Sequence, residues 1–523
     1  MKVYKSMTMI KNITQGVFIS ILLNCFLIAN DKQFSSKLTP IMIDNSILIF
    51  VPYEKLDRQT MSLNKLKAYA DDNQNPVPTV KDYQNININT VTALNIVRIN
   101  SVLASKSVDE VDTIEKITLL VDRENKNIAI EHIEDYAKDG SITTAPTFLD
   151  YTYAGLRCVD QKKVEKINNT IKNTNDTIWD VQQVINKSNG MESILLDNDA
   201  FDPDWVIMLT ATLGLAEQCE ANVAGIVLTG RDINAKQGML YSSILYYYDR
   251  SDIPLGLNGK QIMRTYSIRA TQEDPTHINY KGTFSSIDDF PSDQCIDYEW
   301  CWGRNEATDM LCTILSESDE KITWVVGGHM HNVANLLNET EVCNGKELIS
   351  KKIKQIVIST GWEDRTKADP EMNLSEGTSK PNSAIEATKY VFRNRPNNVP
   401  IILASVPNSR THQSRVGDVF LNNKYNNSPM SYILSVPTYG IYGDHGLSDT
   451  EALMYAVRNG ISKNNITYTQ KVKTCFNLHN NGAITIGNNC VKEDYYLEKT
   501  ISNYADVLST EVEKLISSMP LKK

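Results

Sequence analysis

Short apolar runs alternate with helical patterns throughout residues 191–523, and this alternation restricts the chain to few folds. We predict strands at residues 193–196, 224–228, 323–328 and 354–360, and helices at residues 206–215 and 238–248. Because strands separated by helices pair in parallel, the pattern predicts one α/β domain with an open, mostly parallel, doubly wound sheet. Ligands of such sheets bind at the carboxyl ends of the strands, where the polar clusters of this sequence fall.

Residues 31–190 are rich in Asn, Lys, Ile and Asp and poor in Gly, and they predict a smaller N-terminal accessory region of unknown fold. Two apolar runs, residues 117–121 and 128–133, flank the polar segment DRENKN and predict a hairpin. Apolar residues at helical spacing from Val164 to Ile185 predict a connecting helix. We expect no internal repeat that would change the fold class.

The first thirty residues have the pattern of a secretory signal. Three lysines precede an apolar run at residues 17–29, which is short for a bilayer span. We therefore expect residues 1–30 to be a signal peptide, a mature chain that begins near residues 30–35, and a secreted or periplasmic protein; an uncleaved anchor is the alternative. Cleavage would remove Cys25 and leave eight cysteines, an even number that suits disulfides. No CxxC motif supports a structural zinc site.

Composition excludes one class of partner. The 523 residues carry a net charge of -10 and are 41% hydrophobic, which is typical of a globular protein without a basic surface. We expect no nucleic-acid partner, no membrane partner after signal cleavage, and leave open a homo-oligomer.

The segment LLDNDAFDPDWVIML, residues 195–209, places four carboxylates between a predicted strand and a predicted helix: Asp197, Asp199, Asp202 and Asp204. A helix N-terminus offsets only one or two of these charges. Calcium accepts irregular cages of carboxylate and carbonyl oxygens, so a Ca²⁺ site is one explanation. A solvated acidic loop in which Asp204 caps the helix is the other.

The order of motifs resembles that of the inosine-uridine preferring nucleoside hydrolases. The motifs are LLDNDAFDPDWVIML, VAGIVLTG, YYYDRSDIPLG, TWVVGGHMHNVANLL, KQIVISTGW, PEMN and GLSDTEALMYAVRNG, all within residues 191–523. The resemblance implies a nucleoside hydrolase-like domain that cleaves the N-glycosidic bond of ribonucleosides with calcium-activated water.

The resemblance also implies a set of metal ligands. Asp199 matches the aspartate that binds calcium and acts as general base, and Asp449 matches the late metal-binding aspartate. Asp204 matches a residue that contacts both the metal and a ribose hydroxyl, with Asp202 as the competing candidate. His331 occupies a position that offers the metal its backbone carbonyl.

Substrate contacts are implied in the same way. Glu371 and Asn373 match the pair that holds the ribose hydroxyls, and Asn332 is a further substrate-binding candidate. We expect Asp199, Asn332, Glu371, Asn373 and Asp449 to converge in one crevice, because strand ends meet at the switch point of this fold.

Two residues depart from the family pattern. Trp205 stands where a second aspartate is expected, and Ser448 stands where many members have histidine. His445 is our candidate for protonating the departing base, and His329 is the other.

These departures keep two other functions open. One is a catalytically inactive protein of the same fold that binds a ribosylated or sugar ligand. The other is a different metal-dependent hydrolase on a doubly wound sheet, because a fold does not fix a function.

Overall fold

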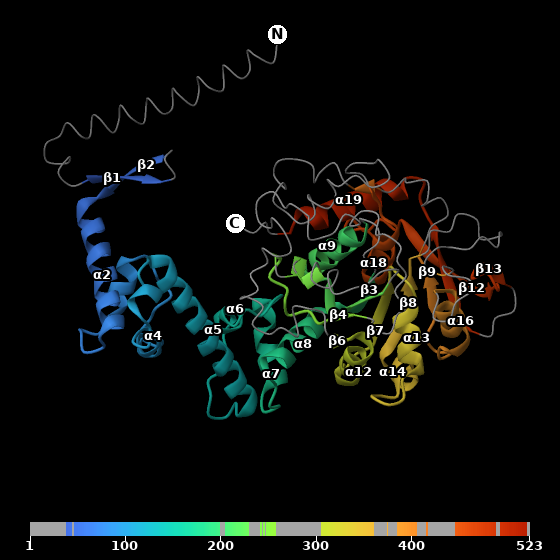
Figure 1. Cartoon of the computed structure of the whole chain (residues 1–523), viewed down its shortest axis with the longest axis horizontal. Helices are drawn as coiled ribbons and strands as arrows, with labels where there is room; N and C mark the ends of the chain where they lie inside the picture. The colour runs from blue at the N-terminus through green and yellow to red at the C-terminus, as the bar shows by residue number, and fades with distance from the viewer. Residues whose placement is uncertain are drawn as a thin grey trace, which may run out of the picture. The chain divides into compact units, whose positions relative to one another are not determined.

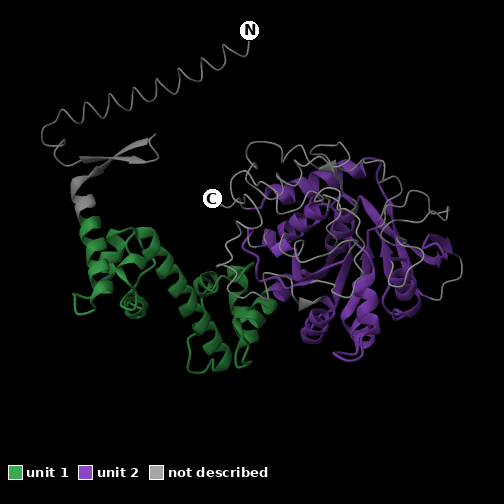
Figure 2. Ribbon diagram, in the orientation of Figure 1, with its two compact units in different colours: residues 1–185 green, residues 186–523 purple. Residues whose placement is uncertain are grey.

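The computed structural model divides into two compact units, residues 1–185 and residues 186–523 (Figure 2). It describes residues 38–43, 47–198, 204–229, 241–242, 244–245, 247–257, 305–359, 374, 384–404, 415–416, 445–487 and 492–519. Within these ranges, no helix combines the length and the apolar character that a bilayer crossing requires.

A ten-stranded sheet forms the centre of the second unit, in the order β13-β12-β14-β9-β8-β7-β3-β4-β5-β6 (Figure 1). The strands are β3 (Glu192–Asn198), β4 (Ala221–Leu228), β5 (Leu255–Leu257), β6 (Asn305–Glu306), β7 (Ile322–Val326), β8 (Ile353–Ile358), β9 (Ile401–Leu403), β12 (Thr469–Leu478), β13 (Ile484–Gly487) and β14 (Asp494–Lys499). All pairs from β6 to β14 are parallel, and β12 pairs antiparallel with both neighbours. The predicted open, mostly parallel sheet is confirmed, and its switch point lies between β3 and β7.

Helices cover both faces of this sheet (Figure 1). One face packs against α9 (Asp204–Glu217), α18 (Ser448–Arg458) and α19 (Tyr504–Ser517). The other packs against α12 (Ala307–Glu317), α13 (His331–Asn338), α14 (Gly345–Lys352) and α16 (Ala384–Asn394). Along β3, Ile194 and Leu196 join the first core and Leu195 joins the second, as strand alternation requires.

The predicted strands and the helix at residues 206–215 are confirmed by β3, β4, β7, β8 and α9. In the helix predicted at residues 238–248, the described positions 241–242, 244–245 and 247 are helical. Short strands β10 (Arg415–Val416) and β11 (His445–Gly446) pair antiparallel apart from the main sheet.

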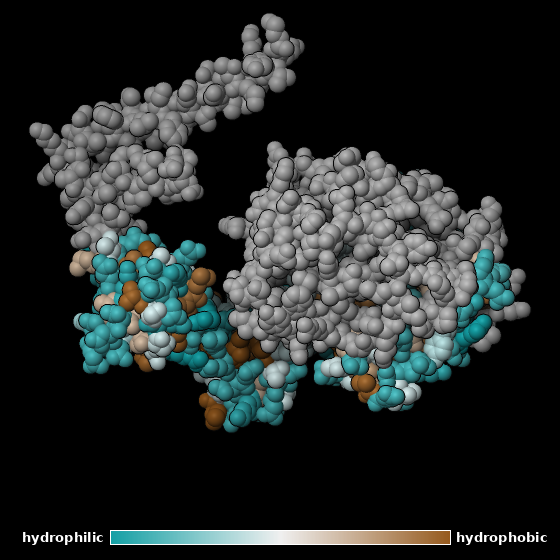
Figure 3. All heavy atoms as spheres, in the orientation of Figure 1, coloured by the Kyte–Doolittle hydropathy of each residue, from teal (hydrophilic) through white to brown (hydrophobic). Residues whose placement is uncertain are grey.

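The first unit is helical, after a two-stranded antiparallel sheet of β1 (Leu38–Ile43) and β2 (Ile47–Pro52). Its α-helices are α2 (Tyr53–Asp71), α3 (Val80–Asn85), α4 (Ile96–Leu103), α5 (Ile114–Lys138), α6 (Phe148–Tyr153), α7 (Val164–Ile171) and α8 (Ile178–Asn189), with short 3₁₀ turns η2 (Val108–Glu110) and η3 (Gln161–Lys163). The surface in view is mostly hydrophilic with scattered apolar side chains (Figure 3), which is ordinary for a folded protein.

The hairpin predicted at residues 117–133 is wrong, because α5 runs through the whole segment. Two of the polar residues in its middle are buried and have partners: Glu124 pairs with Arg98, and Asn125 accepts a hydrogen bond of 2.7 Å from Asn95. The polar interval therefore contains part of a buried network, and it is not a turn. The connecting helix predicted from Val164 to Ile185 is two helices, α7 and α8.

The first unit also contains a short internal repeat, which leaves the fold class of the second unit unchanged. In the first copy, the Tyr83 hydroxyl donates to Asn100 Oδ1 at 2.7 Å, and Asn100 Nδ2 donates to the Pro78 carbonyl at 2.8 Å. All three residues are buried or lie beside the core of α2, α3, α4 and the first half of α5.

The second copy repeats this network at a constant step of 68 positions, from 83 to 151, from 100 to 168 and from 78 to 146. Tyr151 donates to Asn168, and Asn168 Nδ2 donates to the Pro146 carbonyl at 2.8 Å. The second half of α5 packs with α6, α7 and α8 in the core of this copy. The two copies therefore share α5.

Matching caps and charge pairs support the repeat. Asp82 closes a capping box with Thr79 at the start of α3, and Asp150 closes one with Thr147 at the start of α6. Lys65 Nζ lies 2.7 Å from Asp82 Oδ2. In the second copy, His132, one position short of the 68-residue step from Lys65, has its Nδ1 atom 3.3 Å from Asp150 Oδ1. The sequence signal for the repeat is short, PTVKDY followed by PTFLDY.

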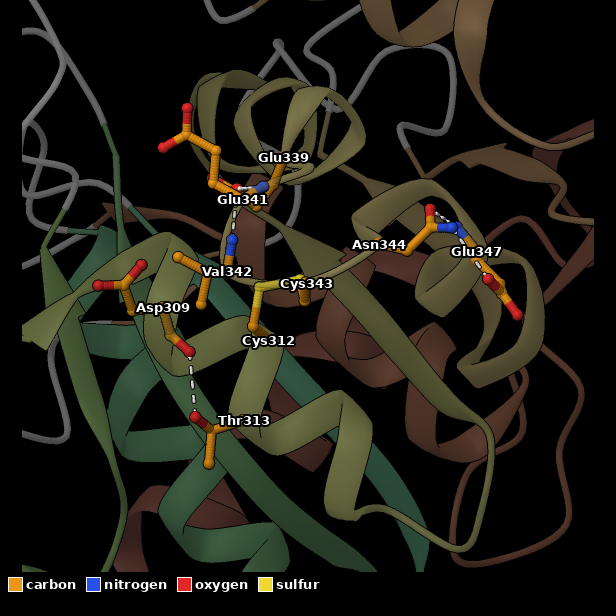
Figure 4. Close-up of a disulfide and its surroundings, with 9 residues drawn as sticks. All are labelled: Asp309, Cys312, Thr313, Glu339, Glu341, Val342, Cys343, Asn344 and Glu347. Atoms are coloured by element: carbon orange, nitrogen blue, oxygen red, sulfur yellow. Dashed lines mark hydrogen bonds between the residues drawn. A yellow bond between two sulfur atoms is a disulfide. The ribbon is translucent and has the colours of Figure 1, made fainter.

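A disulfide ties a helix to a helix–helix connection on one face of the sheet in the second unit (Figure 4). Cys312 of α12 bonds to Cys343, which lies between α13 and α14, at a sequence separation of 31. The bond encloses β7 and α13 in a covalent loop. Cys158, Cys219 and Cys475 are also disulfide-bonded.

We predict that Tyr83→Phe and Tyr151→Phe each destabilise their own copy by about 1–3 kcal/mol, because each change leaves a buried asparagine oxygen without its donor. Hydrogen exchange of the full chain should show faster exchange in α3 and α4 for the first variant and in α6 and α7 for the second. Tyr153→Phe is the control, because the Tyr153 hydroxyl makes no hydrogen bond within the described ranges. Unchanged exchange in both variants would contradict the role of the network.

We predict that the first unit loses stability in acid through two aspartates. Burial alone would raise the pKa of Asp82, but hydrogen bonds from Lys65 and Thr79 outweigh burial and lower it. Likewise, hydrogen bonds from Thr147 and His132 outweigh burial and lower the pKa of Asp150. A lowered pKa in the folded state gives stability that is complete above the unfolded value, about 3.9, and is lost as the pH falls through the folded value.

The measurement is hydrogen exchange in α3 and α6 between pH 6 and pH 3, corrected for the intrinsic rate at each pH. Asp82→Asn should weaken the acid response of α3 and leave that of α6 unchanged, and Asp150→Asn should do the reverse. An acid response that neither substitution alters would rule out these two carboxylates as its origin.

We predict that Cys312→Ala/Cys343→Ala lowers the free energy of unfolding by about 3–4 kcal/mol, which is the loop-closure entropy for a loop of this length. Thermal melts of the two proteins, with and without reductant, test this. The reductant should destabilise the wild type more than the variant. Equal destabilisation by the reductant would show that the Cys312–Cys343 bond contributes little.

Candidate functional site

Strand β3 ends in two buried polar residues, Asp197 and Asn198, neither of which is exposed to solvent. Successive side chains of a strand point to opposite faces, so the two residues face different helices. Asp197 Oδ1 accepts a hydrogen bond of 2.9 Å from Asn332 Nδ2, in the first turn of α13. The Asp197 carbonyl accepts a second bond, of 2.7 Å, from the Gly327 amide just after β7.

Asn198 reaches the helix on the other face. Its Nδ2 donates to the Trp205 carbonyl at 3.2 Å, in the first turn of α9, and its own carbonyl accepts from the Thr229 amide at 2.9 Å. The side chain therefore links the end of the strand to the start of the helix that follows it.

Gly327 brings the start of α18 to the same place. A Cβ atom at this position would lie 2.9 Å from Asn198 Oδ1, 3.1 Å from Asp449 Cγ and 3.1 Å from Met208 Sδ. A Cβ atom would force these three side chains to shift, so the glycine lets Asn198 and Asp449 both lie against the backbone at this position. Asp449 is in the first turn of α18 and is 5% exposed.

Two histidines lie in the turn between β7 and α13. His329 and His331 are both buried, and their ring centroids are 5.4 Å apart. His331 is the first residue of α13, directly before Asn332. The turn thus places imidazole rings and backbone carbonyls beside the end of β3.

Trp205 faces the core. Its indole has no solvent exposure and stacks on Tyr241, with ring centroids 4.5 Å apart and an interplanar angle of 24°. A carboxylate at this position would have to enter an apolar cluster, so position 205 itself supplies no acidic ligand.

The structure therefore brings together three of the predicted site residues, His331, Asn332 and Asp449, at the carboxyl ends of β3 and β7. Asp204 begins α9 and His445 lies in β11, but their side chains are outside the described part. Asp199, Asp202, Glu371 and Asn373 lie wholly outside it.

Asn198 and Gly327 are not among the site residues predicted from sequence. Asn198 lies between Asp197 and Asp199. Its signal is the alternation of β3, which places it on the same face as Leu196 and therefore under α9. The signal for Gly327 is a glycine pair directly after a buried strand.

The described donors suit a hard cation only in part. Asp449 offers a carboxylate and the turn before Asn332 offers carbonyls, which are the oxygen ligands that calcium prefers. Among the residues whose side chains are described, no three His, Cys, Asp or Glu residues cluster as metal ligands. A complete cage would need the carboxylates of residues 199–204.

No family model and no curated protein matches this sequence. Among solved structures, the chain is similar to an inosine-uridine preferring nucleoside hydrolase from Bacillus anthracis, with a TM-score of 0.43, 14% identity, and coverage of 62% of this chain and 100% of the other. It is also similar to an inosine-guanosine nucleoside hydrolase, with a TM-score of 0.44, 18% identity, and coverage of 62% and 99%. A third is the type III effector protein XopQ complexed with adenosine diphosphate ribose, with a TM-score of 0.41, 12% identity, and coverage of 63% and 94%.

Proposed function

We propose that residues 191–523 form an N-ribohydrolase that cleaves ribonucleosides with the help of bound calcium. The observation that carries this proposal is that Asn198 and Asp449 both lie against Gly327. Asn332 lies beside them, because it donates a hydrogen bond to Asp197, the neighbour of Asn198 in β3. These residues come from motifs far apart in the sequence, and they meet at the switch point where doubly wound sheets bind ligands.

The proposed calcium ligands are the carboxylates of Asp199, Asp204 and Asp449 and the backbone carbonyl of His331. Bound there, the ion would lower the pKa of a water molecule and so supply a nucleophile at neutral pH. Asp199 would accept the proton of that water. Asp204, Asn332, Glu371 and Asn373 would orient the ribose through its hydroxyl groups, which lowers the barrier by fixing the reacting atoms in place.

Departure of the base requires a proton donor. Ser448 stands where the resemblance expects histidine, so another residue would have to supply the proton. His445 is our first candidate and His329 the second. His329 has the support of position, since it lies buried in the turn that also contains His331. Histidine is the side chain that most often acts as a general acid, which is the role that the step requires.

We further propose that the protein is exported. The apolar run after Lys11 supports this proposal, and so does the Cys312–Cys343 disulfide, because disulfides persist in oxidising compartments.

One observation favours a second function, the binding of a ribosylated or sugar ligand without hydrolysis. The stacking of Trp205 on Tyr241 fills the position of an expected acidic ligand with an apolar ring. A weakened cage would retain the ribose contacts and lose the activation of water.

The deciding experiment incubates the mature protein with purine and pyrimidine ribosides in calcium and measures the free base. We expect release by the wild type and a decrease in kcat of about 100-fold or more for Asp199→Asn, because an amide cannot accept the proton of water. Calcium affinity, measured by calorimetry, should fall in the same variant. Asp309→Asn, an exposed residue of α12, is the control for the substitution itself.

Three results would redirect the proposal. A wild type that neither binds calcium nor releases base contradicts the hydrolase and leaves the ligand-binding function. Calcium binding without release supports the inactive protein. If Asp199→Asn binds calcium as tightly as the wild type does, Asp199 is not a calcium ligand, and Asp202 is the next candidate.

A further inference from the structure

Asp197 is a fully buried carboxylate for which the proposed chemistry has no use. Burial of a charged group is costly unless hydrogen bonds or an opposite charge compensate for it. Asn332 Nδ2 supplies one such bond at 2.9 Å, and its place in the first turn of α13 brings the positive end of that helix close to the carboxylate. The carboxylate and the start of α13 therefore stabilise each other.

The same residue holds the other end of the turn through its backbone. The Gly327 amide donates to the Asp197 carbonyl at 2.7 Å, so one residue of β3 binds both the first and the last residue of the segment 327–332. This segment contains His329 and His331, as well as the His331 carbonyl that the proposed function assigns to calcium. Its position relative to β3 depends on these two bonds.

The charge of Asp197 also fixes which way Asn332 points. A carboxylate only accepts hydrogen bonds, so the amide nitrogen of Asn332 must face it and Oδ1 must face away. Asn332 is 1% exposed, and its Oδ1 has no hydrogen-bond partner among the residues that the structure describes. The orientation leaves one buried acceptor available on the side opposite Asp197.

We propose that Asp197 is a positioning residue that, through Asn332 and Gly327, holds the β7–α13 turn in register with the end of β3. This role rests on the proposed function, because that function assigns calcium and ribose contacts to the turn. It does not require Asp197 to be a metal ligand or a base. Residues that position first-contact ligands in this way typically affect metal affinity or activity by about 10- to 100-fold.

The test compares Asp197→Ala, Asn332→Asp and the exchange variant Asp197→Asn/Asn332→Asp. The exchange variant keeps the bond with its direction reversed, because Asn at 197 donates to Asp at 332. Asn332→Asp alone places two carboxylates at hydrogen-bond distance, and they must share a proton. Asn338→Asp, at the exposed end of the same helix, is the matched control.

We expect Asp197→Ala to lower calcium affinity and kcat by about 10- to 100-fold with a smaller change in KM. Because Asn332 is itself a proposed ribose contact, activity of the variants at position 332 does not bear on the positioning role. In calcium-free protein, hydrogen exchange of residues 327–333 should be faster in Asn332→Asp than in the wild type, and it should return toward the wild-type rate in the exchange variant. A purely structural role of Asp197 would lower the melting temperature without this local change in exchange. Unchanged exchange in Asn332→Asp, or failure of the exchange variant to recover, would overturn the proposal.

Hydrogen exchange of residues 327–333 in calcium-free protein separates this proposal from the proposed function. Faster exchange in Asp197→Ala, reversed in the exchange variant, supports the positioning role even if the wild type releases no base. Base release by the wild type, together with unchanged exchange in Asp197→Ala, would retain the hydrolase and refute the positioning role.

Discussion

Burial of the Asp197 carboxylate costs free energy unless polar neighbours compensate for it. The arrangement at the switch point provides that compensation. Asn332 and the start of α13 approach β3 from one face. Asn198, the next residue, binds the first turn of α9 on the other face, and the absence of a side chain at Gly327 lets Asp449 join it. Asp197 and Asn198 thus lie where the first turns of α13, α9 and α18 come together. Helix N-termini carry partial positive charge, so the point suits anionic groups as well as the acidic loop that follows.

Much of the second unit could be predicted from sequence because its elements obey simple periodicities. Residues 324–326 and 356–358 are apolar runs, and both are completely buried in a sheet that helices cover on both faces. The resemblance of the motifs supplied His331, Asn332 and Asp449 as candidates, and the rule that strand ends meet at the switch point predicted that Asn332 and Asp449 would lie together. Asn198 and Gly327 could not be assigned in this way, because their roles depend on distances between side chains of three separate elements.

The first unit was harder to predict for a physical reason. Its stability depends on polar groups inside the core, and a sequence shows polarity without showing partners. Glu124 and Asn125 resemble the residues of a turn until Arg98 and Asn95 are placed beside them. The repeat was missed because its invariant part is the sparse set formed by a proline, a capping box, a tyrosine and a distant asparagine. The apolar residues between them vary, as they can in a core that only needs volume filled.

Helix α5 has a consequence for how the first unit responds to stress. Its first half completes one core and its second half begins the next, so neither copy has a complete set of helices without it. In arrays of independent domains, each domain can unfold while its neighbour stays intact. Here, loss of α5 exposes both cores together, so global unfolding of the unit should be one cooperative transition, while local opening of α3 and α4 or of α6 and α7 stays within one copy. Under mechanical tension, the unit would then extend in a single step. A protease that cut near the middle of α5 would destabilise both copies together.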